Sequence, residues 1–376
     1  MSDWNIIIIF TQDLGFFRGT KCCCYLEYNM LDIKNILKEF CSISSPSGHE
    51  YLAARRIVDC IHKCGERINV ETDVLGNICF KKQGKGDKTI MLVAHYDEIG
   101  FSIKFIDVGG YIYFTSIGCV DPSILRGQRV LITHNGKQIL GVIGATPIHI
   151  SFQQKHGRNS DYDIGELWID IGAKSKEEAE KIVSIGDPIT FCPNYYELSN
   201  DVFTSKGIDN RAGLVALLSV YEQIKDIDTE YTISFVATAQ EELGLRGAKI
   251  AAYSMAPDVC IVIDVTHATD YSAIDKRKYG YIGIGNGAVI PKGPNFNFSL
   301  QQELCEIANT HNVKYQIESI SGYSGTDAAE IQLSKGGCRT GLISIPCRYM
   351  HTPIEIASFK DIKSVIELLV CYCKTK

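Results

Sequence analysis

Residues 232–247 read TISFVATAQEELGLRG, and this stretch decides which fold we expect. Its first eight residues form a largely apolar run, which is typical of a buried strand. Two adjacent carboxylates, Glu241 and Glu242, follow the run, and residues 245–254 have the apolar spacing of a helix. A strand that leads through a polar turn into a helix is the unit from which α/β proteins are built. We therefore predict an α/β sheet with two acids at the end of one strand.

The same alternation extends on both sides of this stretch. The segment KTIMLVAH at 88–95 is short and almost wholly apolar, as expected of a parallel strand that is buried on both faces. The other elements follow from apolar periods near 2 and 3.6. In order they are helices 31–41 and 48–65, a strand pair 68–82, helix 209–224, strand 259–265, helix 299–312, strand 340–347 and helix 360–373.

The pattern of the sequence changes between Ile99 and Cys192. Its segments there are short, β-rich and separated by turns, as in a small barrel or sandwich, and one helical pattern at 175–185 interrupts them. A chain of 376 residues also exceeds the usual size of a single core. We predict catalytic segments at 30–98 and 193–376 with an inserted β-rich domain at 99–192. A single irregular α/β protein is the alternative.

Composition and charge limit the partners of the chain. The net charge is −6 and no dense Lys/Arg run is present, which argues against nucleic acid or an anionic membrane as the partner. The apolar run within residues 1–29 is too short to span a membrane and lacks the flanks of a signal peptide. We assign 1–29 no function, and the natural start is Met1 or Met30. The 15 cysteines are scattered without a C-x-x-C pair, so we expect free thiols in a reducing cytoplasm.

Acids and histidines gather where predicted strands end. In open α/β sheets, ligands bind beyond the carboxyl ends of the strands. A single acid or histidine at such a place is usually a helix cap or a satisfied polar group. Here five segments end in this way, and the residues are His95 with Asp97, Asp209, Glu241 with Glu242, Asp264, and His351.

This set of side chains suits divalent cations. Two histidines and several carboxylates are ligands for a metal of borderline hardness. Carboxylates crowded together would otherwise repel one another and raise one another's pKa values. The set is too large for one tetrahedral ion, so we predict two ions that share a carboxylate. In a hydrolytic site of this kind, one of Glu241 and Glu242 would bind metal and the other would accept a proton from the attacking water.

Several motifs of the chain resemble those of one enzyme family. They are AHYDEIGF (94–101), GIDNRAG (207–213), TAQEELGLRGA (238–248), VIDVTHATD (262–270), SGTDAAEIQLSKGG (324–337) and TGLISIPCRYMHTPIE (340–355). In this order they resemble the glutamyl-aminopeptidase or tetrahedral-aminopeptidase family of dinuclear metallopeptidases, some of which carry deblocking-aminopeptidase or endoglucanase labels. The resemblance runs from about Met30 to the C-terminus.

The resemblance implies a role for each candidate residue. His95 and Asp264 would bind one metal, Glu242 and His351 the other, and Asp209 would bridge the two. Glu241 would be the general base. Asp97 would orient His95 through its second ring nitrogen.

The resemblance also implies a fold and an activity. The fold would be an α/β/α sandwich of the zinc-aminopeptidase type with an inserted small β-barrel. The enzyme would release N-terminal residues from short peptides with water that two ions activate, and zinc, cobalt or manganese suits the ligands. The inserted domain would join subunits into a homo-oligomer, in the family a tetrahedral dodecamer. The sequence leaves the preferred N-terminal residue open.

Other readings of the same residues stay open. A metal-dependent amidohydrolase or deacylase of N-acyl amino acids would use the same ions, and a glycoside hydrolase or a non-catalytic interaction protein is a weaker alternative. Residues 321–326, SGYSGT, form either a wall of the substrate pocket or a glycine-rich turn. We predict turns, not a phosphate loop, at Gly283, Gly285 and Gly287, because no lysine follows in P-loop spacing.

Overall fold

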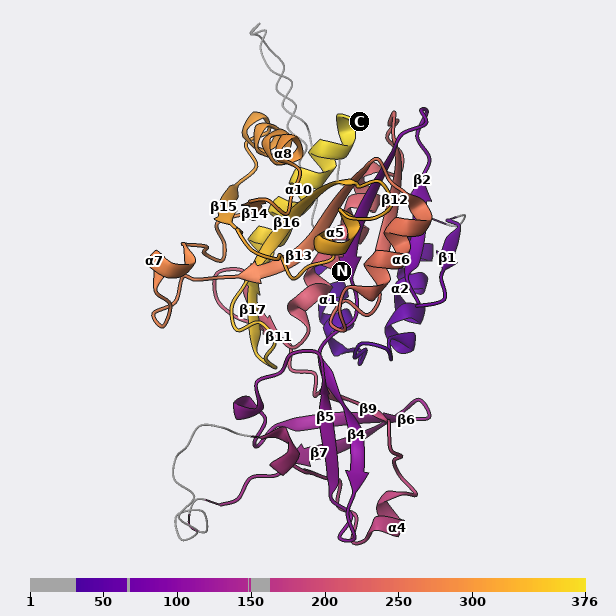
Figure 1. Cartoon of the computed structure of the whole chain (residues 1–376), viewed down its shortest axis with the longest axis vertical. Coiled ribbons are helices and arrows are strands. Elements are labelled where there is room, and N and C mark those ends of the chain that lie inside the picture. The colour runs from indigo at the N-terminus through magenta and orange to yellow at the C-terminus, as the bar shows by residue number, and fades with distance from the viewer. Residues whose placement is uncertain (1–31, 66–67, 148, 150–162) are drawn as a thin grey trace, which may run out of the picture. The chain divides into compact units, whose positions relative to one another are not determined.

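The computed structural model describes residues 32–65, 68–147, 149 and 163–376 (Figure 1). Every described residue belongs to one compact unit of the chain, 31–376. The segment 1–29, to which we assigned no function, lies outside the described residues.

An eight-stranded sheet forms the centre of the α/β part. Its middle strands β12, β3, β13 and β16 are parallel, whereas β2 and β14 are antiparallel to their neighbours β12 and β16. The strands in spatial order are β1 (Val70–Thr72), β2 (Ile78–Lys82), β12 (Thr232–Thr238), β3 (Thr89–His95), β13 (Val259–His267), β16 (Arg339–Cys347), β14 (Ala288–Lys292) and β15 (Tyr315–Ser319).

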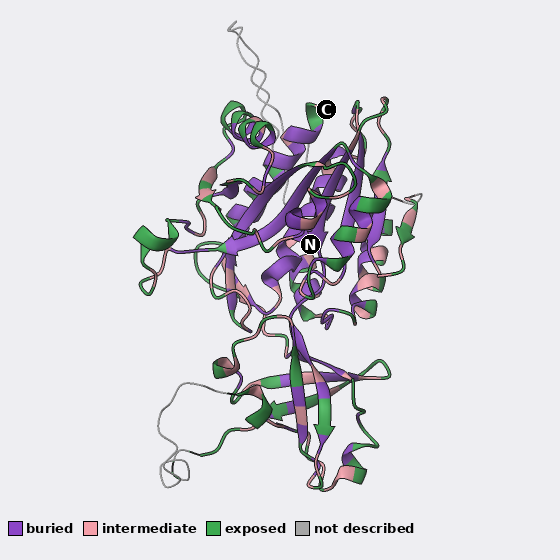
Figure 2. Ribbon diagram, in the orientation of Figure 1, coloured by how far each residue is buried: buried purple, intermediate pink, exposed green. Residues whose placement is uncertain are grey.

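Helices cover both faces of this sheet. Strand β3 shows why, because Ile90, Leu92 and Ala94 point into one apolar core while Met91 and Val93 point into another. The first core contains α1 (Ile33–Ser42), α2 (Tyr51–Cys64), α5 (Ile208–Ile224), α8 (Phe298–Thr310) and α10 (Phe359–Lys374), and the second contains α6 (Arg246–Met255) and α9 (Ala328–Ile331). Figure 2 shows the buried strands between these layers. The predicted α/β/α sandwich is confirmed.

The β-rich segment closes into a six-stranded barrel with its own core. Rings of Phe101, Phe114 and Phe191 pack edge to face in its interior, with centroids 5.2 and 5.5 Å apart. The barrel strands in order are β4 (Gly100–Ile106), β5 (Ile112–Ile117), β8 (Ile169–Asp170), β7 (Lys137–Ile143), β6 (Arg129–His134) and β9 (Pro188–Phe191). A barrel, not a sandwich, is therefore the form that this segment takes.

A third, small sheet joins the end of the barrel segment to the C-terminal part. It consists of β10 (Tyr196–Glu197), β11 (Val202–Ser205) and β17 (Glu355–Ser358), all antiparallel.

The helix predicted at 175–185 is much shorter in the structure. It is α4 (Lys176–Ala179), where the Ser175 hydroxyl accepts from the Glu178 amide as an N-cap. After α4 the backbone continues in turns, in which the amides of Ile182 and Val183 both donate to the Ala179 carbonyl, and the Gly186 amide then donates to the carbonyl of Ile103 in β4 (2.9 Å). The regular helix therefore covers only four of the residues predicted, and turns replace the rest.

The sequence did not predict β14 and β15. Strand β15 reads YQIES, and none of its residues is fully buried, so no apolar run marks it. Strand β14 contains Pro291, which usually argues against a strand within a sheet.

The other general expectations concern membranes and thiols. Among the described helices none has both the length and the apolar character that a membrane crossing needs. Most cysteines of the described ranges are buried free thiols.

Candidate functional site

The candidate residues meet at one edge of the central sheet. His95 is the last residue of β3, Glu241 and Glu242 follow β12, and Asp264 lies in the second half of β13. Because these strands are parallel, their carboxyl ends lie at the same edge. Asp209 comes from the start of α5, and His351 from the turn between β16 and β17.

The side chains form two groups around Asp209. One Asp209 oxygen, Oδ1, lies 3.1 Å from His95 Nε2, and the other, Oδ2, lies 3.4 Å from His351 Nε2. His95 Nε2 is also 3.6 Å from Asp264 Oδ1, and His351 Nε2 is 3.3 Å from Glu242 Oε1. Among the described residues, Asp209 is thus the carboxylate that contacts both histidines.

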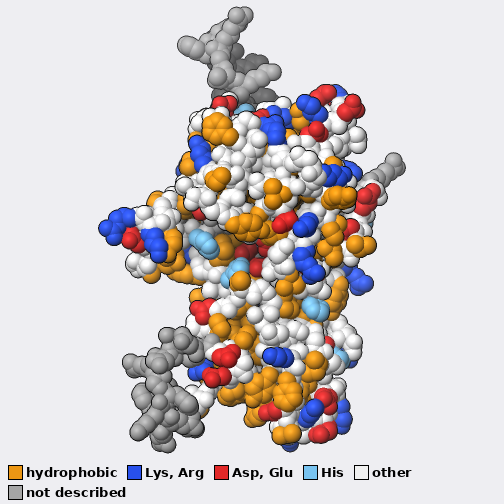
Figure 3. All heavy atoms as spheres, in the orientation of Figure 1, with side chains coloured by type: hydrophobic (Ala, Val, Ile, Leu, Met, Phe, Trp, Pro, Cys, Tyr) orange, Lys and Arg blue, Asp and Glu red, His pale blue; other side chains and the backbone are white. Residues whose placement is uncertain are grey.

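Each group has the dimensions of a cation site. The ligand atoms of His95, Glu241 and Asp264 all lie within 4.8 Å of one another, and so do those of Asp209, Glu242 and His351. Figure 3 shows Asp and Glu side chains gathered in a hollow of the surface with His side chains beside them. The structure therefore brings together all six side chains that the sequence suggested as metal ligands or general base. Together we call them the cluster: His95, Asp209, Glu241, Glu242, Asp264 and His351.

The electrostatics of the cluster favour bound cations. Burial raises the pKa of Glu241 well above its usual range, and the neighbouring acids Asp264 and Glu242 add to the rise. Burial also raises the pKa of Glu242 and of Asp264 against the effect of the histidines, with Asp209 as a further cause in both cases. Divalent ions would stabilise the charged carboxylates, so the donor set fits two such ions.

The same carboxylates stabilise the positively charged form of the two histidines. Burial opposes charge on His95 and His351, but contacts with neighbouring carboxylates outweigh it and raise both pKa values, that of His351 to about 12. At Asp209 burial is likewise outweighed, because the two histidines lower the pKa of this carboxyl. A metal ion would take the place of the proton that each histidine otherwise holds.

Asp97 lies beneath the cluster and is fully buried. Its Oδ1 is 3.4 Å from His95 Nδ1, the ring nitrogen that points away from the cluster, but the two atoms do not form a hydrogen bond. The two Asp97 oxygens also accept the backbone amides of Glu241 and Glu242, each at 3.1 Å. The Ser47 hydroxyl donates to Asp97 as well. Sequence reasoning missed these backbone contacts and Ser47, which stands in the Ser/Pro/Gly turn before α2.

The barrel supplies one contact to the cluster that the sequence did not suggest. His351 Nδ1 donates to the carbonyl oxygen of Cys119, 2.8 Å away, in the loop after β5. A Cβ on the neighbouring Gly118 would lie 3.3 Å from Glu242 Oε2, so the loop approaches the site closely. No sequence signal marks this contact, since a backbone carbonyl belongs to every residue.

The glycine-rich loops have different surroundings. Tyr323, in the 321–326 segment, is 70% exposed, and the nearby charge of Glu241 contributes to raising its pKa, after burial and Glu330. The 321–326 segment is mostly exposed and forms neither helix nor strand, so it has the form of a loop. The amides of Gly285 and Gly287 donate to the buried Asp361 carboxylate (2.6 and 2.7 Å), so this loop is an internal turn, as predicted.

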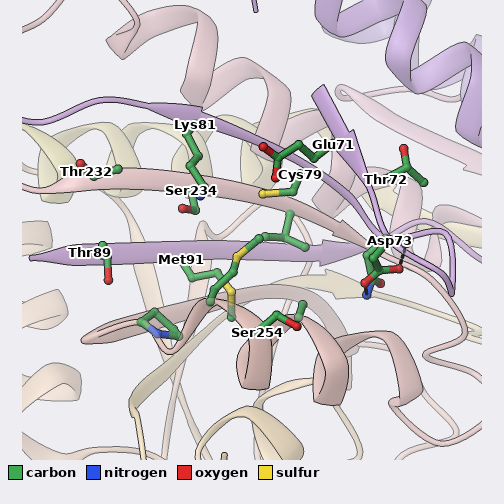
Figure 4. Close-up of a pocket in the computed structure, with 15 residues that line it drawn as sticks. Glu71, Thr72, Asp73, Cys79, Lys81, Thr89, Met91, Thr232, Ser234 and Ser254 are labelled. Atoms are coloured by element: carbon green, nitrogen blue, oxygen red, sulfur yellow. Dashed lines mark hydrogen bonds between the residues drawn. The ribbon is translucent and has the colours of Figure 1, made fainter. Parts of the chain in front are cut away.

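A cavity of about 380 Å³ lies elsewhere in the molecule. Its floor is formed by β2, β12 and β3, and α6 forms one wall (Figure 4). Cys79, Met91 and Ser254 are among its lining residues, and it shares no residue with the cluster.

Comparisons with known proteins identify relatives over most of the chain. The family model of the M42 glutamyl aminopeptidases matches residues 76–368. A putative aminopeptidase of Acetivibrio thermocellus is 37% identical over 342 residues, which cover 90% of this chain and 98% of the relative. The lysyl aminopeptidase of Pyrococcus furiosus is 34% identical over 337 residues, 89% of this chain and 94% of the relative.

Solved structures resemble the fold over the same length. The aminopeptidase APDkam598 from the archaeon Desulfurococcus kamchatkensis has a TM-score of 0.85 and 33% identity, with 92% of this chain and 95% of that chain covered. The TET1 peptidase of Pyrococcus horikoshii, which can assemble into a tetrahedron or a large octahedral shell, has a TM-score of 0.80 and 30% identity over 91% and 99% of the two chains. A Thermotoga maritima structure named endoglucanase has a TM-score of 0.73 and 28% identity over 90% and 96%.

Proposed function

We propose that this chain, which belongs to the M42 glutamyl aminopeptidase family, releases N-terminal residues from short peptides at the cluster around Asp209. Its relatives named lysyl and glutamyl aminopeptidase support a peptidase that acts at N-termini. The observation that carries the proposal is the position of Asp209, whose two oxygens face His95 and His351 at 3.1 and 3.4 Å.

We assign two divalent ions to the cluster. His95 and Asp264 would hold one, Glu242 and His351 the other, and Asp209 would contact both. Two bound ions would lower the pKa of a water molecule and neutralise the charge that develops on the peptide carbonyl oxygen. Histidine and carboxylate ligands suit zinc, cobalt or manganese.

We assign the proton transfers to Glu241. It is buried, it belongs to the same group of donors as His95 and Asp264, and no hydrogen bond or ion pair between its carboxylate and another described side chain competes for it. Burial and neighbouring acids raise its pKa, which suits a group that accepts a proton from water and then donates it to the leaving amine. Asp97, through its bonds to the amides of Glu241 and Glu242, would hold both glutamates in place.

The test is a substrate screen with and without chelator. Purified protein is assayed on aminoacyl-nitroanilides, among them lysyl and glutamyl, on acetylated amino acids and on β-glucan. We expect cleavage of aminoacyl-nitroanilides only, loss of cleavage after chelation, and recovery when zinc, cobalt or manganese is added. Cleavage of acetylated amino acids alone would instead support the deacylase alternative.

The endoglucanase name of a structural relative does not change this proposal. Glycoside hydrolysis needs a carboxylic acid and a carboxylate on opposite sides of the scissile bond. In this cluster, Asp209, Glu242 and Asp264 each lie within 3.6 Å of a histidine nitrogen, as expected of metal ligands. Of the four acids in this cluster, only Glu241 would not bind metal, whereas glycoside hydrolysis needs two free carboxyl groups.

We further propose that the inserted domain, 99–192, joins subunits into a homo-oligomer, with 30–98 and 193–376 as the catalytic domain. The related TET1 peptidase forms closed shells, which supports a tetrahedral dodecamer. Phe105, Leu140 and Val142 on the barrel strands are 53, 57 and 43% exposed, and apolar side chains of this size favour burial between subunits. The buried free thiols support a reducing cytoplasm as the location.

A further inference from the structure

Glu355 is a buried carboxylate that contacts two of the proposed ligand residues. It is the first residue of β17 and is only 2% exposed. Its Oε2 accepts a hydrogen bond from the backbone amide of Asp209 (3.1 Å), and its Oε1 accepts one from the backbone amide of His351 (2.9 Å). One side chain thus binds the backbone at two residues that lie 142 positions apart in the chain.

Both amides would otherwise lack a regular partner. The Asp209 amide lies at the irregular start of α5, where Asp209 has a non-helical backbone (φ −75°, ψ 107°), so it has no acceptor within the helix. His351 stands in a turn with φ +61°, a conformation that a non-glycine side chain disfavours. An external acceptor is therefore needed to hold each residue where its side chain reaches the cluster.

The sheet fixes Glu355 itself. Its backbone pairs with Ser205 of β11, and α5 begins three residues after Ser205. His351 lies only four residues before Glu355, at the end of the turn that leads into β17. The Glu355 carboxylate consequently joins the start of α5 to the turn before β17. Between these two segments, His351 Nε2 lies 3.4 Å from Asp209 Oδ2.

Asp97 makes the same kind of contact on the other side of the cluster. Each of its oxygens accepts a backbone amide, from Glu241 and from Glu242. Four of the residues around the cluster are thus held through their backbones by two buried carboxylates. Groups beneath metal ligands commonly set ligand orientation, and their removal weakens metal binding.

We propose that Glu355 is a positioning residue that holds Asp209 and His351 at the separation at which both side chains share a divalent cation. This inference rests on the proposed function, because it requires that the cluster binds metal. In Glu355→Gln the amide nitrogen would face one of the two backbone N–H groups, so one hydrogen bond is lost and two donors meet. Glu355→Asp keeps the charge but is too short to reach both amides.

The matched control is Asp361→Asn. Asp361 is also fully buried and also accepts two backbone amides, from Gly285 and Gly287, but it contacts none of the proposed ligands. A loss of general stability should therefore be similar in the two variants, whereas an effect on metal binding should appear only at Glu355.

The experiment is a titration of metal-free protein with Zn²⁺ or Co²⁺ alone, followed by calorimetry and by the Co²⁺ absorption spectrum. We expect wild type and Asp361→Asn to bind two ions alike. In Glu355→Gln and Glu355→Asp one of the two ions should bind about 10- to 100-fold more weakly, with an altered Co²⁺ spectrum. High metal concentration should then restore kcat with little change in KM.

Two failures are distinguishable in this design. Wild-type protein that binds no metal would overturn the proposed function. Wild type that binds two ions, with Glu355 variants of unchanged affinity and spectrum, would overturn the inference alone. If Glu355→Gln does not fold, Glu355→Asp decides the question by the same titration.

Discussion

Glu241 and Glu242 are neighbours in the sequence, yet their carboxylates belong to different groups of the cluster. The backbone explains the divergence. Gln240, just before the pair, has φ +58°, and the amides of Glu241 and Glu242 point to opposite oxygens of Asp97. The Gln240 amide donates to the buried Glu50 carboxylate at 3.1 Å. The backbone of the turn is thus held at three successive amides, which fixes where the two side chains start.

The two glutamates should respond differently to the same substitution. In Glu241→Gln we expect both ions to stay bound while kcat falls by about 10²- to 10⁴-fold, since a general base is lost and no proposed ligand changes. In Glu242→Gln we expect one ion to be lost. Metal content by mass spectrometry and steady-state kinetics would measure both effects. Near wild-type kcat in metal-loaded Glu241→Gln would contradict the assigned role.

At the scale of elements, the turn from β12 to α6 brings the backbone of α6 close to the backbone at the end of β12. A Cβ on Gly247 would lie 2.2 Å from the carbonyl oxygen of Ala239 and 2.3 Å from Asn77 Oδ1. Asn77 accepts from the Ala239 amide and donates to the Gly247 carbonyl, each at 2.9 Å. Only glycine lets α6 begin this close to the end of β12, and this places the two glutamates at the sheet edge.

A side chain at position 247 should therefore disturb this junction. We expect Gly247→Ala to lower the free energy of unfolding by about 1–3 kcal/mol, because the methyl group meets backbone atoms that cannot move independently. Urea unfolding would measure the change. Gly336→Ala is the control, since its Cβ would meet nothing within 4 Å. Equal stability of the two variants would show that the junction is less tight than the structure indicates.

At the scale of the whole molecule, the outer face of the barrel offers apolar side chains for assembly. Along β7, Leu140 and Val142 are exposed, whereas Gly141 and Ile143, which alternate with them, are buried. This alternation is that of a strand with one face in the barrel core and the other available to a partner.

Charges on that face should therefore weaken assembly. We expect Leu140→Asp combined with Val142→Asp to shift the protein towards smaller species in light scattering, with the fold retained by circular dichroism. Val74→Asp is the control, because Val74 is 93% exposed and lies outside the barrel. A wild-type monomer, or an unchanged mass in the double variant, would count against assembly through β7.

The sequence by itself determined the elements whose signal is local. The apolar runs at 88–95, 232–239 and 259–265 became β3, β12 and β13, and the acids and histidines at their ends met as expected. Side-chain periodicity is a property of neighbouring residues, and parallel strands place their carboxyl ends at one edge. The helix predicted at 175–185 forms only over 176–179 and then gives way to turns, which the apolar period did not distinguish from a helix.

Only the tertiary structure decided which groups hold the cluster. Glu355 accepts from the Asp209 amide, the Cys119 carbonyl accepts from His351, and Asp97 accepts from the amides of both glutamates, all across long separations in the chain. Glu355 stands within the apolar segment IEIA, and its charge there gives no indication of its partners. Hydrogen bonds between distant segments depend on how the layers pack, and a local pattern does not encode that packing.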